Sequence, residues 1–137
     1  MCLSTLWPKK KLRELQKYSR LNPIKGYKVV FIHTGGGYLS KLRGPYRGIT
    51  YKTGYRVTRA GKPTIIRFQE RIGPREQHRW VPKTYQSGIH VYAKLKDAER
   101  HAGSNYNRII PCLIWDITAA GENGGLTYVA QKMMLLC

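Results

Sequence analysis

Basic residues and tyrosines alternate along the first half of this sequence, and their chemistry is that of anion binding. Arg and Lys side chains contact phosphates, and Tyr rings stack on bases and form hydrogen bonds. Only Glu14 among the acidic residues precedes residue 70, whereas a merely solvated surface normally mixes both signs of charge. We therefore predict a surface for an anionic partner, formed by Lys9, Lys10, Lys11, Arg13, Lys41, Arg43, Tyr46, Arg47, Tyr51, Lys52, Tyr55, Arg56, Arg59 and Arg67.

The net charge of +18 is concentrated in the same part of the chain. Residues 1–87 contain 20 Lys and Arg and three acidic residues, which gives +17, whereas residues 88–137 contain five and four, which gives +1. A field of this size attracts polyanions. The charge does not distinguish between four kinds of partner: nucleic acid, a nucleotide, an acidic protein and an anionic membrane. We expect the near-neutral second half to supply the core and a surface for homo-oligomer formation.

No group of side chains predicts a catalytic or metal site. The spacing of the histidines yields no Ser/His/Asp or Cys/His arrangement, and His33 and His90 are more typical of structural residues. The glycines at 35–37 lack the Gly-Lys-Ser/Thr ending of a phosphate loop and predict a turn. The alternative is that the backbone N–H groups of this turn form a nest that binds a nucleotide phosphate. We predict no cofactor.

The elements that must position the basic residues begin with an amphipathic helix over 8–21, which carries Leu12 and Leu15 on one stripe. A strand over 27–33 follows. The alternation over 55–59 and 64–70, with a turn at 60–63, predicts a hairpin that points Lys52 or Arg56, Arg59 and Arg67 outward. Turn residues and charges over 71–87 predict a long surface loop.

In the second half we predict a strand at 88–92, a helix over 94–101 ended by Gly103, a strand over 108–118, a turn at 121–125 and a closing strand over 126–136. This order predicts the α+β class: an antiparallel β-sheet with an N-terminal helix and one short helix packed on one face. We expect a single domain over 1–137, in which 1–25 form a basic helix or arm and 26–137 a β-rich core.

The apolar runs are too short to span a bilayer, so we predict no transmembrane segment and a cytoplasmic protein. The charge at 9–11 follows the apolar N-terminus, which is the reverse of a secretory signal. Cys2, Cys112 and Cys137 lack the spacing of a zinc site. We expect three reduced thiols, with Cys112 in the core.

Two segments resemble small uncharacterised phage and prophage proteins. The first is Tyr27-Lys28-Val29-Val30, and the second is the strand at 88–92 followed by Asp97-Ala98 and His101-Ala102. Such proteins end in an apolar hairpin, as residues 113–136 are expected to do. They include counter-defence factors, some similar to sponges for nucleotide signals and others to anti-CRISPR proteins. The resemblance implies a counter-defence role in a host cell.

The strand that contains His90 and Tyr92 also resembles the central strand of ADP-ribosyltransferases. In that family a His on the first strand and a later aromatic hold NAD, and a Glu near the last strands assists transfer. The matching positions are His33-Thr34, His90 or Tyr92, and Glu122. Glu122 lies between turn glycines, which departs from the family pattern.

We thus predict a non-enzymatic basic binding protein, a phage counter-defence factor whose partner is nucleic acid, a nucleotide signal or a nucleic-acid-bound protein complex. The first alternative is a small ADP-ribosyltransferase-like enzyme that uses NAD. The second alternative is a structural RNA-binding protein, which fits the charge equally well.

Overall fold

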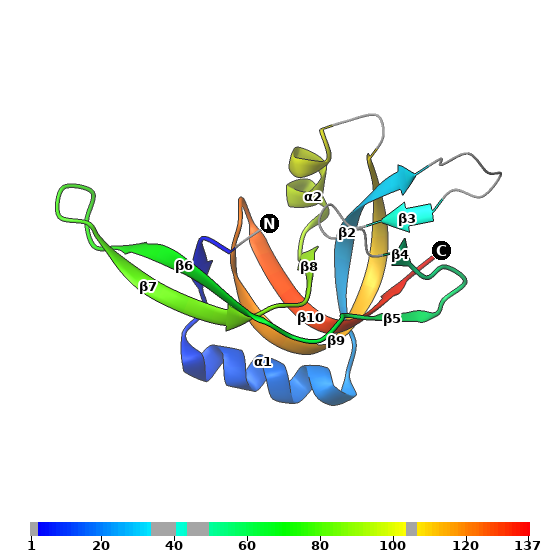
Figure 1. Cartoon of the computed structure of the whole chain (residues 1–137), viewed down its shortest axis with the longest axis horizontal. Coiled ribbons are helices and arrows are strands. Elements are labelled where there is room, and N and C mark those ends of the chain that lie inside the picture. Colours follow the sequence, from blue (N-terminus) through cyan, green and yellow to red (C-terminus); the bar gives the residue numbers. More distant parts are fainter. Residues whose placement is uncertain (1–2, 34–40, 44–49, 104–106) are drawn as a thin grey trace.

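The computed structural model describes residues 3–33, 41–43, 50–103 and 107–137, without the side chains of 31–33, 41–43 and 107. It has the predicted α+β class, with 53% of the residues in strands and 19% in helices (Figure 1). The elements in chain order are β1 (Thr5–Leu6), α1 (Lys9–Leu21), β2 (Ile24–His33), β3 (Lys41–Arg43), β4 (Thr50–Tyr51), β5 (Val57–Arg59), β6 (Ile65–Ile72), β7 (Arg79–Gln86), β8 (Ile89–Tyr92), α2 (Leu95–Ala102), β9 (Asn107–Glu122) and β10 (Leu126–Leu135).

The strands of the main sheet close into a ring. β9 pairs with β10 over residues 112–122 and with β2 over residues 107–114, so its middle has a partner on each edge. β8 completes the ring, because it pairs with β10 and, at Tyr92, with Tyr27 of β2. The long strands β9 and β10 bend sharply to make this closure possible (Figure 1). A register shift between Val129 and Ala130 marks a bulge at the bend, since bulges increase the local bend of a strand.

The inward faces of these strands form the main core. Val30, Val91, Cys112, Ile114, Met133 and Leu135 are fully buried there, which confirms the predicted place of Cys112. Lys28 lies on the same face of β2 as Val30 and is also buried, at 3% exposure. The ring therefore encloses one basic side chain among apolar ones.

α1 docks on the bent part of β9 (Figure 1). Leu12 and Leu15 pack against the main core, as the amphipathic pattern predicts. The fully buried Ser19 hydroxyl accepts a hydrogen bond from the Ile117 N–H at 3.1 Å and donates to the Gln16 carbonyl. Because Ile117 lies at the bulge, this hydroxyl supplies a partner to a backbone N–H at the point where the β9–β10 register shifts.

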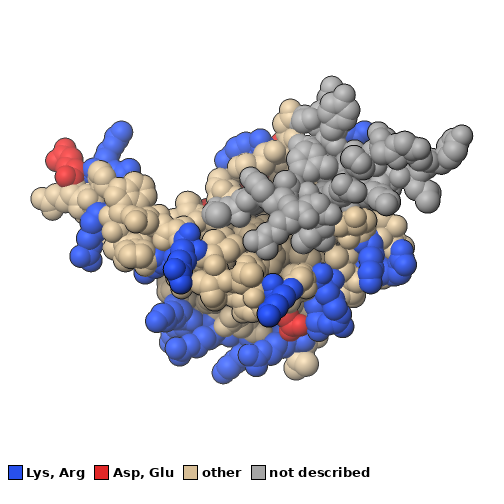
Figure 2. Space-filling view, in the orientation of Figure 1, with Lys and Arg blue, Asp and Glu red and all other residues tan. Residues whose placement is uncertain are grey.

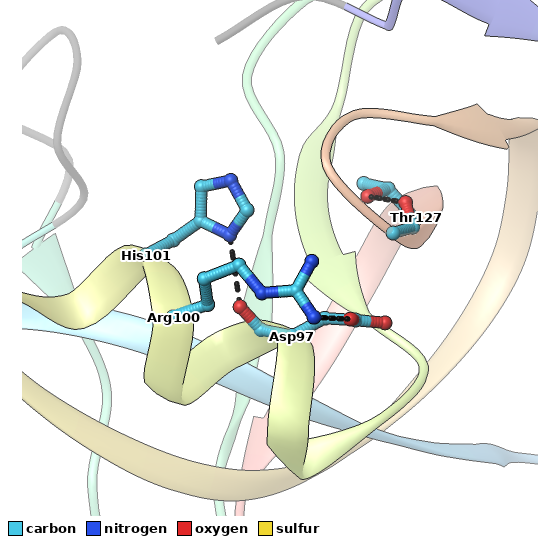
Figure 3. Close-up of polar contacts among 5 residues, drawn as sticks. Asp97, Arg100, His101 and Thr127 are labelled. Carbon is cyan, nitrogen blue, oxygen red and sulfur yellow. Dashed lines mark hydrogen bonds and ion pairs between the residues drawn. The ribbon is translucent and has the colours of Figure 1, made fainter.

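α2 covers a separate small cluster through Ala98, which packs with Val29 and Tyr92. Gly103 ends the helix in the left-handed conformation at φ 46°, as predicted. The helix also abuts the turn between β9 and β10 (Figure 3). A side chain at Gly124 would displace His101 and one at Gly125 would displace Asp97, and both glycines have positive φ angles, of 66° and 143°, which favour glycine.

β6 and β7 form a hairpin of their own, which projects from the body at the left of Figure 1 and which we call the arm. Two sequence predictions are wrong here. Residues 71–87 are not a loop. Exposed and partly buried side chains alternate along β6 as far as Ile72, the chain turns at a tip formed by 73–78, and the alternation continues along β7. β5 does not pair with β6, because Thr58 is buried and β5 joins the edge of β10 instead.

The base of the arm is fixed to the body by a third cluster. Tyr85 packs with Leu3, Ala119 and Val129, and Ile66 and Phe68 lie against the same group. Glu70 accepts a hydrogen bond from the Leu6 N–H at 3.0 Å. The segment that leads into α1 is thereby held against β6 of the arm.

Candidate nucleic-acid interface

The predicted basic residues fall into two separate surfaces. Lys9, Lys10, Lys11 and Arg13 are exposed on the first turns of α1, and Arg67 is exposed on the arm. Lys52, Tyr55, Arg56 and Arg59 are exposed around β4 and β5, on the opposite side of the molecule in Figure 1. Lys41 and Arg43 lie on β3 with side chains outside the description, and Tyr46 and Arg47 lie outside the described residues.

Tyr51 is not part of either surface, which corrects its predicted role. Its side chain is only 6% exposed and packs in the main core. Burial raises its pKa to about 12. The Lys28 ammonium lies 5.6 Å from the centre of its ring. A base cannot stack on this ring unless the core opens.

The N-terminal end of α1 concentrates positive charge. Lys9, Lys10 and Lys11 occupy its first turn, where no acidic residue is present and where the helix dipole already places partial positive charge. Lys11 also lies 3.9 Å above the Trp7 ring. Like charges at this end of a helix disfavour the helix, whereas a bound anion would relieve the repulsion.

The arm adds a group of exposed residues that are absent from the predicted surface, because the sequence predicts a loop over 71–87. Arg71 on β6, Arg75 in the tip and Arg79 on β7 are exposed, as are His78 and Trp80. The β-branched and aromatic residues Trp80, Val81, Thr84 and Tyr85 were the signal that could have identified β7. Arg71 donates to the Arg75 carbonyl at 3.3 Å, which ties the tip loop to the end of the strand.

The arm and the first turn of α1 adjoin each other. The hydrogen bond from Leu6 to Glu70 fixes the chain three residues before α1 begins at Lys9. Figure 2 shows basic side chains along the lower side of the molecule, over α1, and on the arm at the left. We call this region the arm–helix surface; it comprises Lys9, Lys10, Lys11, Arg13, Arg67, Arg71, Arg75 and Arg79.

Several acidic side chains are turned away from this surface by specific partners. Glu70 lies 3.8 Å from Lys83 and accepts from Leu6, Asp116 lies 3.0 Å from Lys132, and Asp97 lies 3.8 Å from Arg100. Most of the chain's 25 Lys and Arg side chains are, by contrast, exposed. On the arm–helix surface itself, Glu14 on α1 and Glu76 at the tip are exposed, so eight basic side chains face the solvent with two acidic ones among them.

Lys28, His90 and Tyr85 form a connected polar group that reaches the base of the arm. The Lys28 ammonium donates to the His90 carbonyl at 2.8 Å, and the His90 Nε2 lies 3.2 Å from the Tyr85 hydroxyl, which accepts from the Leu3 N–H. Burial lowers the pKa of Lys28 to about 8 and that of His90 to about 4, and Lys28 adds to the second shift. His90 is therefore neutral at pH 7 and is placed to support Tyr85.

The residues that match the ADP-ribosyltransferase pattern lie in different surroundings. Tyr92 is 2% exposed and stacks on His101 at 5.0 Å between ring centres, whereas the Glu122 side chain is exposed at the far end of β9. The side chain of His33 is outside the description. Near Glu122, His101 Nδ1 bonds the Asp97 carbonyl and Thr127 donates to the Gly125 carbonyl, so these polar groups stabilise the helix and the turn (Figure 3).

A small pocket lies between α1 and the bend of β9 and β10. Its volume is about 220 Å³, and Arg20, Asp116 and Gln131 are among its lining residues. Pockets for small ligands usually measure about 300–1,000 Å³. The small volume and the carboxylate of Asp116 make this pocket a poor site for a nucleotide.

Comparison with protein-family models, with curated proteins and with solved structures found no match. The resemblances to phage proteins and to ADP-ribosyltransferases therefore stay predictions. Among the described residues, no helix has both the length and the apolar character needed to cross a bilayer.

Proposed function

We propose that this protein is a non-enzymatic nucleic-acid-binding protein that contacts backbone phosphates through the arm–helix surface. The observation that carries the proposal is the exposed positive charge of α1 and the arm, where the eight Lys and Arg side chains of the arm–helix surface outnumber the two exposed acidic ones, Glu14 and Glu76. Phosphate contacts from Arg and Lys supply most of the affinity of such proteins. A counter-defence role would be one use of this binding, and it requires no catalytic site.

A polymer suits this surface better than a small anion. The exposed basic residues extend from the tip of the arm to the first turn of α1, whereas a nucleotide needs converging groups around one pocket (Figure 2). Phosphates that repeat along a strand can meet charges that are spread over such a distance.

Charge reversal at two matched helix ends tests the proposal. The variant Lys9→Glu/Lys10→Glu changes the first turn of α1, and Lys94→Glu/Lys96→Glu changes the N-terminal end of α2. Both place glutamates where the helix dipole favours them, so neither is expected to unfold the protein. We expect the α1 variant to lose at least about tenfold in affinity for a labelled nucleic acid, measured by fluorescence anisotropy.

The α2 variant is the control, and we expect a change of less than about threefold, because it lies outside the arm–helix surface. Equal losses for the two variants would show that binding depends on net charge alone. Absence of binding to DNA and RNA by the unmodified protein would contradict the proposed function itself.

A further inference from the structure

The two faces of the arm differ in chemistry. One face carries Ile66, Phe68 and Glu70 of β6 opposite Tyr85, Lys83 and Val81 of β7, and its base packs on the body. The other face turns outward and presents Ile65, Arg67, Gln69 and Arg71 opposite Gln86, Thr84, Pro82 and Trp80. The strict alternation of exposure along β6 separates these faces.

The outward face combines positive charge with side chains that can recognise bases. Arg67, Gln69 and Thr84 are all exposed there, and the strands contribute no acidic residue to this face. Glu70, the acidic residue of β6, is on the opposite face, where Leu6 and Lys83 are its partners. Arg pairs with the O6 and N7 atoms of guanine, Gln with the N6 and N7 atoms of adenine, and Thr with either.

The shape of the arm favours duplex DNA. The major groove of B-form DNA is about 12 Å wide and accepts a two-stranded β-ribbon, whereas the major groove of A-form RNA is too narrow for side chains to reach the bases. A single strand is instead bound by successive aromatic rings. On the outward face, Trp80 is the aromatic residue, while Phe68 and Tyr85 lie on the other face.

We infer that the outward face of the arm enters the major groove of duplex DNA and contacts base edges through Arg67 and Gln69. This inference rests on the proposed function and adds a sequence preference to it. Arg71 and Arg75, at the tip end of the arm, contact phosphates beside the groove. The cluster of Leu3, Ile66 and Tyr85 fixes the orientation of the arm relative to the body.

The experiment compares Arg67→Ala and Arg67→Lys with the charge-matched control Lys62→Ala, which alters an exposed residue just before the arm. The sequence preference of the unmodified protein is first selected from a pool of randomised duplex DNA. Affinities are then measured for the selected duplex, for a scrambled duplex, for the duplex RNA of the selected sequence and for its single DNA strands. Circular dichroism checks that each variant melts as the unmodified protein does.

We expect the unmodified protein to select a sequence that contains guanine and to bind it at least about tenfold more tightly than the scrambled duplex. Arg67→Ala should abolish this ratio, and Arg67→Lys should do the same while retaining the dependence on salt, because Lys keeps the charge but not the planar fork. Lys62→Ala should keep the ratio. Methylation of the selected guanine at N7 should weaken binding by the unmodified protein but not by Arg67→Ala.

If the unmodified protein binds duplex DNA without any preference, or if Arg67→Ala behaves like Lys62→Ala, the inference is wrong while the proposed function stands. Tighter binding to duplex RNA or to single strands also overturns it. If no nucleic acid binds, the proposed function fails together with the inference.

Discussion

At the scale of single residues, exposure decides which side chains of the basic and tyrosine pattern can meet a partner. The alternation of basic residues and tyrosines predicted exposed anion-binding side chains, and Lys9, Lys10, Arg56 and Arg67 are exposed. Tyr51 belongs to the same pattern but is buried, because β4 turns it toward the main core. A strand of two residues has too little alternation to show from the sequence which face is inward.

Lys28 is the residue whose burial has the clearest measurable consequence. Its pKa is about 8 in the folded protein and 10.5 in the unfolded chain, so the unfolded chain binds more protons between these values. The free energy of unfolding therefore increases as the pH rises through this window. We expect an increase of about 1 kcal/mol from Lys28 between about pH 7.5 and pH 9.

Urea denaturation of the unmodified protein and of Lys28→Met at both pH values measures this contribution as a difference. Cys112 and Tyr51, whose pKa values burial raises, lower the stability at higher pH in both proteins. The difference between the two proteins therefore reports the removal of Lys28, which includes the loss of its lowering effect on the Cys112 pKa. If the free energy of unfolding changes equally with pH in the unmodified protein and in Lys28→Met, the Lys28 ammonium is solvated and the account of its burial is wrong.

At the scale of elements, the sequence predicted the helices and strands that have strong local patterns. The amphipathic spacing of Leu12 and Leu15 gave α1, and Gly103 gave the end of α2. The arm was missed because Gly73-Pro74 and the charges around it are typical of a loop as well as of a hairpin tip. The pairing of β5 with β10 joins residues that are far apart in the chain, which local patterns do not encode.

The docking of α1 yields a prediction about stability. Ser19→Ala removes the buried hydroxyl that accepts from the Ile117 N–H and leaves that donor without its partner. We expect a loss of about 1–3 kcal/mol in the free energy of unfolding, measured by urea denaturation. The matched control is Ser4→Ala, whose exposed hydroxyl donates to the Glu122 carbonyl and should cost less than about 0.5 kcal/mol.

Equal effects of the two serine substitutions on the free energy of unfolding would show that α1 does not depend on this contact.

The docking of α1 also changes the expected role of residues 1–25. They include Leu3, which is buried under the arm, and Leu12 and Leu15, which cover the main core. The segment thus contributes to the packing as well as to the charge.

At the scale of the whole molecule, the charge is the property that sequence and structure describe in the same terms. The sequence places +17 of the +18 net charge in residues 1–87, and the fold exposes most of it on α1, on the arm and around β5. The sequence could not show that the arm and the first turn of α1 adjoin, since this depends on the hydrogen bond between Leu6 and Glu70.

The most direct test of the central claim is the salt dependence of binding to a duplex DNA of about 20 base pairs. If about six phosphates are contacted by the arm–helix surface, the slope of log K against log salt concentration should be about −5. Affinity should then fall roughly a thousandfold between about 50 and 200 mM salt. An affinity that does not change over this range would contradict nucleic-acid binding through the exposed basic residues.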